Sequence, residues 1–217
     1  MKGNKRSGLS KLLIFLGFLF VIILALVITY YSSFYPKTDV KQLNSTIVID
    51  KGYMIKKFLP DKFNLSLKEI FVESDASFNQ DEITDFFILA FNEIPELKEN
   101  VTGLKAKIEN DTINLYINFK YKGLPVESKL IFTGESIDGK GVFHYKEGNV
   151  GFLNISKDRI FSNLQDTSIV QFDKDNGNVI LSFEGIKQLD IKDVTIKDNE
   201  ISFVFRGTLK FYNFSFK

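Results

Sequence analysis

The sequence predicts an α+β protein, with an N-terminal transmembrane helix followed by a bent antiparallel sheet packed on one main amphipathic helix. Three observations predict this class. An uncharged run near the N-terminus is long enough to cross a membrane, and one later segment repeats apolar residues at helical spacing. Most of the remaining chain alternates apolar and polar residues, which is typical of strands.

The uncharged run extends from Leu12 to Pro36. Its apolar part ends at Tyr31 and covers about 20 residues, or roughly 30 Å of helix, which matches the hydrocarbon thickness of a bilayer. The basic residues near its start all precede it, and the cytoplasmic flank of a span carries the excess of Lys and Arg. We therefore expect a cytoplasmic tail at 1–11 and a signal anchor at 12–34 in the plasma membrane.

A cleaved signal peptide is the alternative interpretation of this run. Its apolar region would be only about 7–15 residues long and would end at a small-residue cleavage site, which does not follow here. An uncleaved anchor leaves the C-terminal domain outside the cytoplasm. Aromatic residues at the end of the run are then expected to form an interfacial belt, namely Tyr30, Tyr31, Phe34 and Tyr35.

The rest of the chain divides into a predicted connector, 35–63, and an α+β domain, 64–217. Within the connector, Ser45–Asp50 predicts a short strand and Tyr53–Leu59 a helical turn. The domain contains one strong helical pattern, with apolar residues at Ile83, Phe86, Phe87, Ala90, Phe91 and Ile94. Asn79 is its predicted N-cap, Glu82 completes a capping box, and Pro95 ends it.

Strands are predicted wherever apolar residues alternate and turn residues follow. The predicted strands are Asn64–Val72, Leu104–Ile108, Thr112–Tyr121, Val126–Thr133, Gly141–Tyr145, Ile169–Asp173, Val179–Phe183, Ile191–Ile196 and Ile201–Lys210. Asn110-Asp111, Asn176-Gly177 and Asp198-Asn199 predict hairpin turns. A loop is expected at Gly134–Gly141, and a short helix capped by Ser156 at Lys157–Leu164.

Composition excludes several kinds of chemistry. The chain has no cysteine, which rules out disulfides, thiolate metal ligands and thiol nucleophiles. His144 is the only histidine, and no G-x-S-x-G elbow supplies a serine nucleophile for it to activate. The chain after residue 11 is slightly acidic, unlike a nucleic-acid-binding domain. We therefore expect no enzyme, no catalytic residue, no metal, no cofactor and no nucleic-acid partner.

Two groups of carboxylates have ordinary structural interpretations. Asp81, Glu82 and Asp85 lie at the start of the predicted helix, where carboxylates cap the chain and complement the helix dipole, so a paired-carboxylate glycosidase is the weaker interpretation. Residues 173–177 (DKDNG) lack the residue order and closing glutamate of an EF-hand loop. We expect a hairpin turn there.

Apolar binding is the chemistry that the residues leave open. Residues on the periodic apolar faces are the candidates for lining an apolar groove: Phe86, Phe87, Phe91, Leu115, Ile117, Phe119, Phe132, Phe203 and Phe205. The alternative is that these residues simply form the core, since a domain of this size must bury much apolar surface. Periodicity alone does not separate the two interpretations.

The order of segments and two motifs carry a resemblance to a known protein family. A membrane anchor precedes a helix introduced by FNQDEITDFF, in which Gln80–Thr84 matches the family's helix start. A later stretch, NVGFLNISKDRIFSNL, matches at Gly151, Leu153, Ile155 and Ile160, with Ser156 where the family has proline. With these motifs, the sequence resembles the YpmS-like family of uncharacterised membrane-anchored Gram-positive proteins. The architecture of this family is similar to that of TULIP-like lipid-binding domains, and this resemblance implies a role in envelope lipid handling.

Two functions therefore remain open. The first is a membrane-anchored extracytoplasmic domain that binds a phospholipid, a lipid intermediate or another apolar ligand. The alternative is a non-catalytic interaction module that regulates or scaffolds other proteins of the cell envelope. An enzyme acting on cell-wall polymer or lipid would need a polar cleft with facing carboxylates, and the sequence favours it least.

Overall fold

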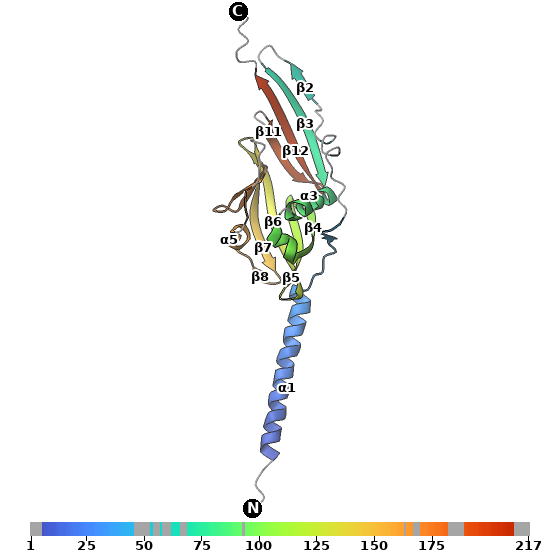
Figure 1. The fold of residues 1–217 in the computed structure, drawn as a ribbon, viewed down its shortest axis with the longest axis vertical. Coiled ribbons are helices and arrows are strands. Elements are labelled where there is room, and N and C mark those ends of the chain that lie inside the picture. Colours follow the sequence, from blue (N-terminus) through green and yellow to red (C-terminus); the bar gives the residue numbers. More distant parts are fainter. Residues whose placement is uncertain are drawn as a thin grey trace, which may run out of the picture.

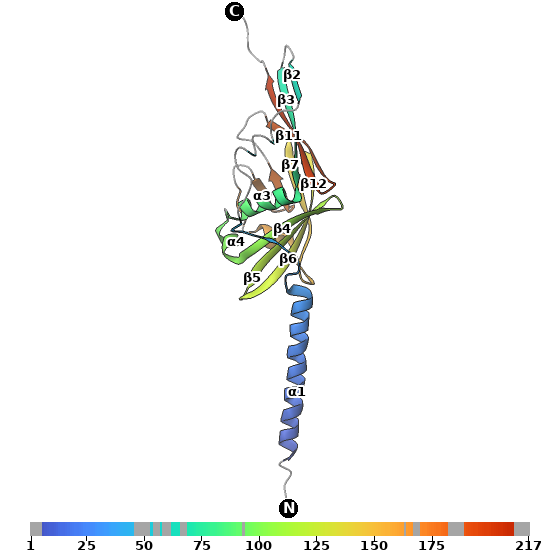
Figure 2. The ribbon, with the colours of Figure 1, turned by 90° about the vertical axis from the view of Figure 1, so that its right-hand side faces the viewer.

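The computed structural model describes residues 6–45, 53, 57, 62–65, 69–92, 94–162, 164–166, 170–181 and 189–210 (Figure 1). Helix α1, Arg6–Thr29, continues into a π-helical turn, η1, at Tyr30–Phe34. The helix projects from one end of the α+β domain, and its side chains from Leu9 onward are almost all exposed. The α+β class is confirmed, and the strands form two antiparallel sheets (Figures 1 and 2).

The larger sheet has eight strands in the order β1-β4-β5-β6-β7-β10-β9, with β8 paired to β7. The strands of this sheet are β1 Lys41–Gln42, β4 Val101–Glu109, β5 Thr112–Tyr121, β6 Leu124–Ile137, β7 Lys140–Val150, β8 Leu153–Asn154, β9 Val170–Asp173 and β10 Asn178–Leu181. The smaller sheet has the order β11-β12-β3-β2, with β2 Lys62–Leu65, β3 Glu69–Asn79, β11 Leu189–Lys197 and β12 Glu200–Lys210. The domain helices whose bounds are described are α3 Gln80–Asn92, α4 Pro95–Asn100 and α5 Lys157–Phe161.

The single strand predicted at Asn64–Val72 is wrong. Its start belongs to β2 and its end to β3, which pair antiparallel with Asn64 opposite Phe71. Strand β3 continues to Asn79 because alternation persists through small residues: Ser74 and Ala76 are buried together with Phe78. Serine and alanine contribute little to an apolar alternation, so the sequence pattern predicts that the strand ends at Val72.

The loop predicted at Gly134–Gly141 is also wrong. Strands β6 and β7 extend across it and are joined by a two-residue turn, Asp138–Gly139. These residues have φ of 50° and 77°. Two consecutive positive φ values define a type I′ turn, for which Asp-Gly is a preferred pair because glycine takes positive φ without steric cost. The predicted turns Asn110-Asp111 and Asp198-Asn199 have the same backbone and are confirmed.

Helix α3 begins as predicted. The Asn79 side-chain oxygen accepts from the Glu82 N–H at 3.0 Å, and the Glu82 carboxylate accepts from the Asn79 N–H at 2.8 Å, forming a reciprocal capping box. The buried face is rotated from the predicted stripe, since Ile88 and Thr84 are buried while Ala90 is exposed. Helix α3 ends at Asn92, and Pro95 begins α4 instead of merely stopping the helix.

A hydroxyl explains the rotation of α3. Thr84 Oγ1 accepts a hydrogen bond from the backbone N–H of Ala106 on β4 at 3.0 Å, and Gln80 Oε1 accepts one from Ile108 N–H at the same distance. Among the described residues, β1 pairs with the outer side of β4 at Leu104 and Gly103 and does not extend to Ala106 or Ile108. The two α3 side chains therefore satisfy edge N–H groups that β1 does not reach.

The core lies where the two sheets and α3 meet. Strand β11 packs against β6, and the ring of Phe203 on β12 lies 6.2 Å from Phe143 on β7. Buried core residues come from both sheets and from two helices, including Ile88, Leu104, Ala106, Ile108, Ile113, Leu130, Phe161, Ile191, Val194, Ile196 and Ile201. One continuous apolar cluster thus holds the sheets together.

The other predicted elements are confirmed or lie outside the described residues. The predicted Ser45–Asp50 strand, apart from Ser45, and most of the Tyr53–Leu59 turn, apart from the helical residues Tyr53 and Lys57, lie outside them. Helix α5 is shorter than predicted, and the hydroxyl of its N-cap Ser156 makes no capping hydrogen bond. The remaining strands appear where the sequence predicts them, several with longer bounds.

Candidate functional site

Five of the nine groove candidates are core residues. Their side chains are no more than 8% exposed and belong to one contact cluster: Leu115, Ile117, Phe132, Phe203 and Phe205. Phe203 lies at the centre, with its ring 5.9 Å from Phe78 and 5.8 Å from Phe205. These side chains contact one another across the sheets instead of facing an open space.

The other four candidates are half-buried. Phe86, Phe87 and Phe91 of α3 pack against the edge of the core, and the Phe86 ring lies 5.1 Å from Phe78. Phe119 lies on β5 opposite Val126, nearer to the α1 end of the domain. The structure therefore brings eight of the nine candidates together in or beside the core. The partly exposed members of this group are the three phenylalanines of α3.

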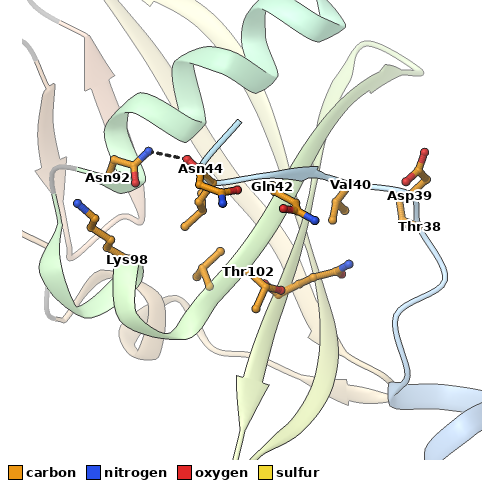
Figure 3. Close-up of a pocket in the computed structure, with 11 residues that line it drawn as sticks. Thr38, Asp39, Val40, Gln42, Asn44, Asn92, Lys98 and Thr102 are labelled. Carbon is orange, nitrogen blue, oxygen red and sulfur yellow. Dashed lines mark hydrogen bonds between the residues drawn. The ribbon is translucent and has the colours of Figure 1, made fainter. Parts of the chain in front are cut away.

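A polar depression lies elsewhere, beside β1 (Figure 3). It is open to solvent and has a volume of about 900 Å³. Its lining comes from the segment around β1, from the ends of α3 and α4, and from β4 and β5: Thr38, Asp39, Val40, Gln42, Leu43, Asn44, Asn92, Lys98, Val101, Thr102 and Asn118. Asn92 and Lys98 lie at one end, and Thr38 and Asp39 at the other (Figure 3).

Hydrogen bonds fix the floor of this polar depression. Asn92 Nδ2 donates to the Leu43 carbonyl at 3.0 Å, and Thr102 Oγ1 donates to the Asn118 carbonyl at 3.1 Å. The side-chain Oδ1 of Asn118 is buried and meets no donor among the described residues.

Sequence reasoning missed the polar depression because six of its eleven lining residues come from the predicted connector. The segment from Thr38 to Asn44 has no apolar periodicity, so no strand was predicted there. Lys41 and Gln42 nevertheless pair with Leu104 and Gly103. Gly103 is required at this crossing, since a Cβ there would lie 2.7 Å from the Lys41 carbonyl oxygen.

An ion pair fastens β1 to the helix. The Lys41 ammonium contacts the Asp85 carboxylate of α3, whose side chain is only 6% exposed. Asp85 was expected to favour the helix start through its charge, but it lies inward and binds the β1 segment instead. The pair therefore holds one wall of the polar depression in place.

Lys41→Met is expected to lower the free energy of unfolding by roughly 1–3 kcal/mol, because it leaves the buried Asp85 charge without its partner. The expected loss is below that of a fully buried pair because Lys41 is one-third exposed. Urea unfolding of the detergent-solubilised chain measures it. The double variant Lys41→Met, Asp85→Leu should recover much of the loss, and equal losses in both variants would contradict the ion-pair account.

The lone histidine has both ring nitrogens engaged. Nε2 lies 2.7 Å from Glu135 Oε1, and Nδ1 lies 2.9 Å from Asn178 Oδ1. A general base needs a nitrogen free to accept the proton of a nucleophile. The arrangement is that of a side chain bridging β6, β7 and β10 on the sheet surface.

The carboxylate of Asp173 is used inside its own turn. The turn joins β9 and β10, as predicted, and Asp173 accepts hydrogen bonds from the side chain and backbone N–H of Asn176 at 2.8 and 3.1 Å. These bonds, the side-chain one first, hold the pKa of Asp173 below its usual range. Across the described part of the chain, no three His, Asp or Glu side chains gather as they would around a metal ion.

The remaining candidate is the helix itself. The segment from Leu9 to Phe34 is long and apolar enough to cross a membrane. It is almost entirely unburied, unlike the core helix of a soluble protein. The resemblance to the YpmS-like family stays a prediction. No family model, curated protein or solved structure matched this chain in the three comparisons.

Proposed function

We propose that this chain is a single-pass membrane protein whose α+β domain lies outside the cytoplasm and works as a non-catalytic interaction module of the cell envelope. The observation that carries the proposal is the exposed apolar helix from Leu9 to Phe34, which continues directly into the domain. The basic residues at its N-terminal side support a cytoplasmic N-terminus.

The polar depression supports recognition of a protein segment over uptake of lipid. Its lining presents amide groups from Gln42, Asn44 and Asn92, with the Lys98 ammonium at one end and the Asp39 carboxylate at the other. Such groups recognise the backbone and polar side chains of a peptide. An acyl chain would need an apolar lining, and five of the six strand residues predicted for one, all except Phe119, lie in the core.

Photo-crosslinking in intact cells tests this role. A photoreactive phenylalanine analogue replaces Gln42 in the polar depression, and Lys197, which is exposed at the end of β11, serves as the matched control. We expect a protein adduct of defined mass from position 42 and none from position 197. Absence of any adduct at position 42, or the same adducts at both positions, would contradict recognition at this depression.

One feature supports a second role, the binding of phospholipid or a lipid intermediate. Phe86, Phe87 and Phe91 of α3 are half-buried at the edge of the core, and an apolar ligand could pack against their exposed parts. Native mass spectrometry of the full chain released from detergent tests this role. Co-purified phospholipid that is lost in Phe91→Asp and retained in Glu99→Ala would favour lipid handling, and an apo mass in the unaltered protein would contradict it.

A further inference from the structure

The end of the domain that meets α1 carries exposed apolar side chains on two neighbouring turns. We name them the apolar rim: Tyr121 and Leu124 at the β5–β6 turn, and Phe152 and Leu153 at the β7–β8 turn. Each of the four is more than half exposed. On β5 the core alternation ends before Tyr121, so the strand extends beyond the core toward α1.

Both turns contact the end of the apolar helix. The Tyr30 hydroxyl donates to the Pro125 carbonyl at 2.8 Å, next to Leu124. On the other turn, the Phe152 ring lies 5.1 Å from the Phe34 ring in an edge-to-face contact. A Cβ on Gly151 would lie 2.8 Å from the Ser33 carbonyl oxygen, which shows that the backbone of this turn packs directly against η1.

These contacts fix the height of the apolar rim relative to a bilayer. Counted from Leu12, the apolar run reaches about 30 Å at Tyr31, where a helix leaves the hydrocarbon core. Tyr30 and Phe34 therefore stand at the outer interface, and the turns that touch them stand at the same level. Figures 1 and 2 show the end of β5 and the start of β6 at the level of the end of α1.

We propose that the apolar rim inserts into the outer-leaflet interface of the bilayer that α1 crosses. This inference rests on the proposed function, because it requires α1 to span the membrane. Tyr and Phe side chains suit this region, where one end of the ring is apolar and the other is wet. The Lys122 ammonium, 5.5 Å from the Tyr121 ring, lies where it reaches lipid phosphates.

A bilayer is the occupant that the geometry favours over a protein partner. An exposed apolar patch usually marks an interaction site, and this one flanks the helix on two sides. A protein covering both turns would have to enter between the domain and the membrane surface. With the rim inserted, two turns and one helix fix the domain at three points, which restrains its tilt on the membrane.

Site-specific fluorescence tests the inference on the full chain. The protein lacks cysteine, so Leu124→Cys and Phe152→Cys each give one site for an environment-sensitive label. The labelled chain is reconstituted into phosphatidylethanolamine–phosphatidylglycerol vesicles that contain lipids carrying a shallow nitroxide quencher. We expect blue-shifted emission and at least roughly twofold quenching at both positions, as for side chains at the membrane interface.

Ile137→Cys is the matched control. Ile137 lies at the opposite end of β6 from Leu124, about 43 Å along the strand at the usual rise per residue, with similar exposure (41% against 54%). A label there should be unquenched by the shallow nitroxide. A label at Ile22, which lies midway along the apolar run and so at the bilayer centre, should be quenched in parallel vesicles whose lipids carry a deep nitroxide near the end of the acyl chain. If the Ile22 label is quenched while positions 124 and 152 behave like 137, the inference is overturned and the anchor stands. If the Ile22 label is not quenched, both proposals fail.

Discussion

Phe203→Ala is expected to lower the free energy of unfolding by about 3–5 kcal/mol, the usual range for removing a buried phenylalanine ring. Phe203 is 6% exposed, and its ring contacts Phe78 and Phe205 in its own sheet and Phe143 in the facing sheet. The cavity left behind would therefore lie between the two sheets and remove packing contacts that join them. Urea unfolding of the detergent-solubilised chain measures the change.

Phe152→Ala is the matched control for this prediction. The same atoms are removed, but Phe152 is 65% exposed, and its ring packs edge-to-face on that of Phe34 outside the core. We expect a loss below about 1 kcal/mol in micelles. Similar losses in the two variants would mean that Phe203 does not hold the sheets together.

Replacing Leu16, Leu19 and Ile23 together by lysine is expected to abolish membrane insertion. Fifteen Leu, Ile, Phe and Val residues between positions 12 and 31 contribute roughly −0.3 to −0.6 kcal/mol each, or about −7 kcal/mol together. Three central lysines cost about 9 kcal/mol, which outweighs that sum. Carbonate extraction of membranes should then release most of the protein.

The control for the anchor places the same three charges at the cytoplasmic end. Ser7, Gly8 and Ser10, all replaced by lysine, add to the basic flank and leave the apolar run intact. Because positive charge on the cytoplasmic side favours this orientation, the variant should stay in the carbonate-resistant pellet. Release of both variants would show that the added charge acts by some route other than the cost of burying lysine in lipid.

Local patterns predicted most of the elements. The long apolar helix, the capping box of Asn79 and Glu82, and the Asn/Asp turns depend on interactions within a few residues, and all three appear in the structure. The failures come from side chains whose partners are distant in sequence. Thr84 is buried because it satisfies Ala106 across 22 residues, which no helical periodicity reports.

The candidate sites were less accessible to sequence reasoning. Core and groove require the same residue types, so the pattern could not tell that Phe132 and Phe205 would fill the core. The polar depression is assembled from a segment without periodicity and from distant polar side chains such as Asn118. The apolar rim is visible only once the two turns are placed against η1.

Membrane topology is the most direct test of the central claim. Single cysteines at Ser7, before the apolar run, and at Asp175, in the exposed β9–β10 turn, are treated in intact cells with a membrane-impermeant maleimide. The account predicts labelling at position 175 in intact cells and at position 7 only after lysis, with both variants in the membrane fraction. Labelling at position 7 but not 175, or recovery of the position-175 variant as a shortened soluble chain, would contradict it.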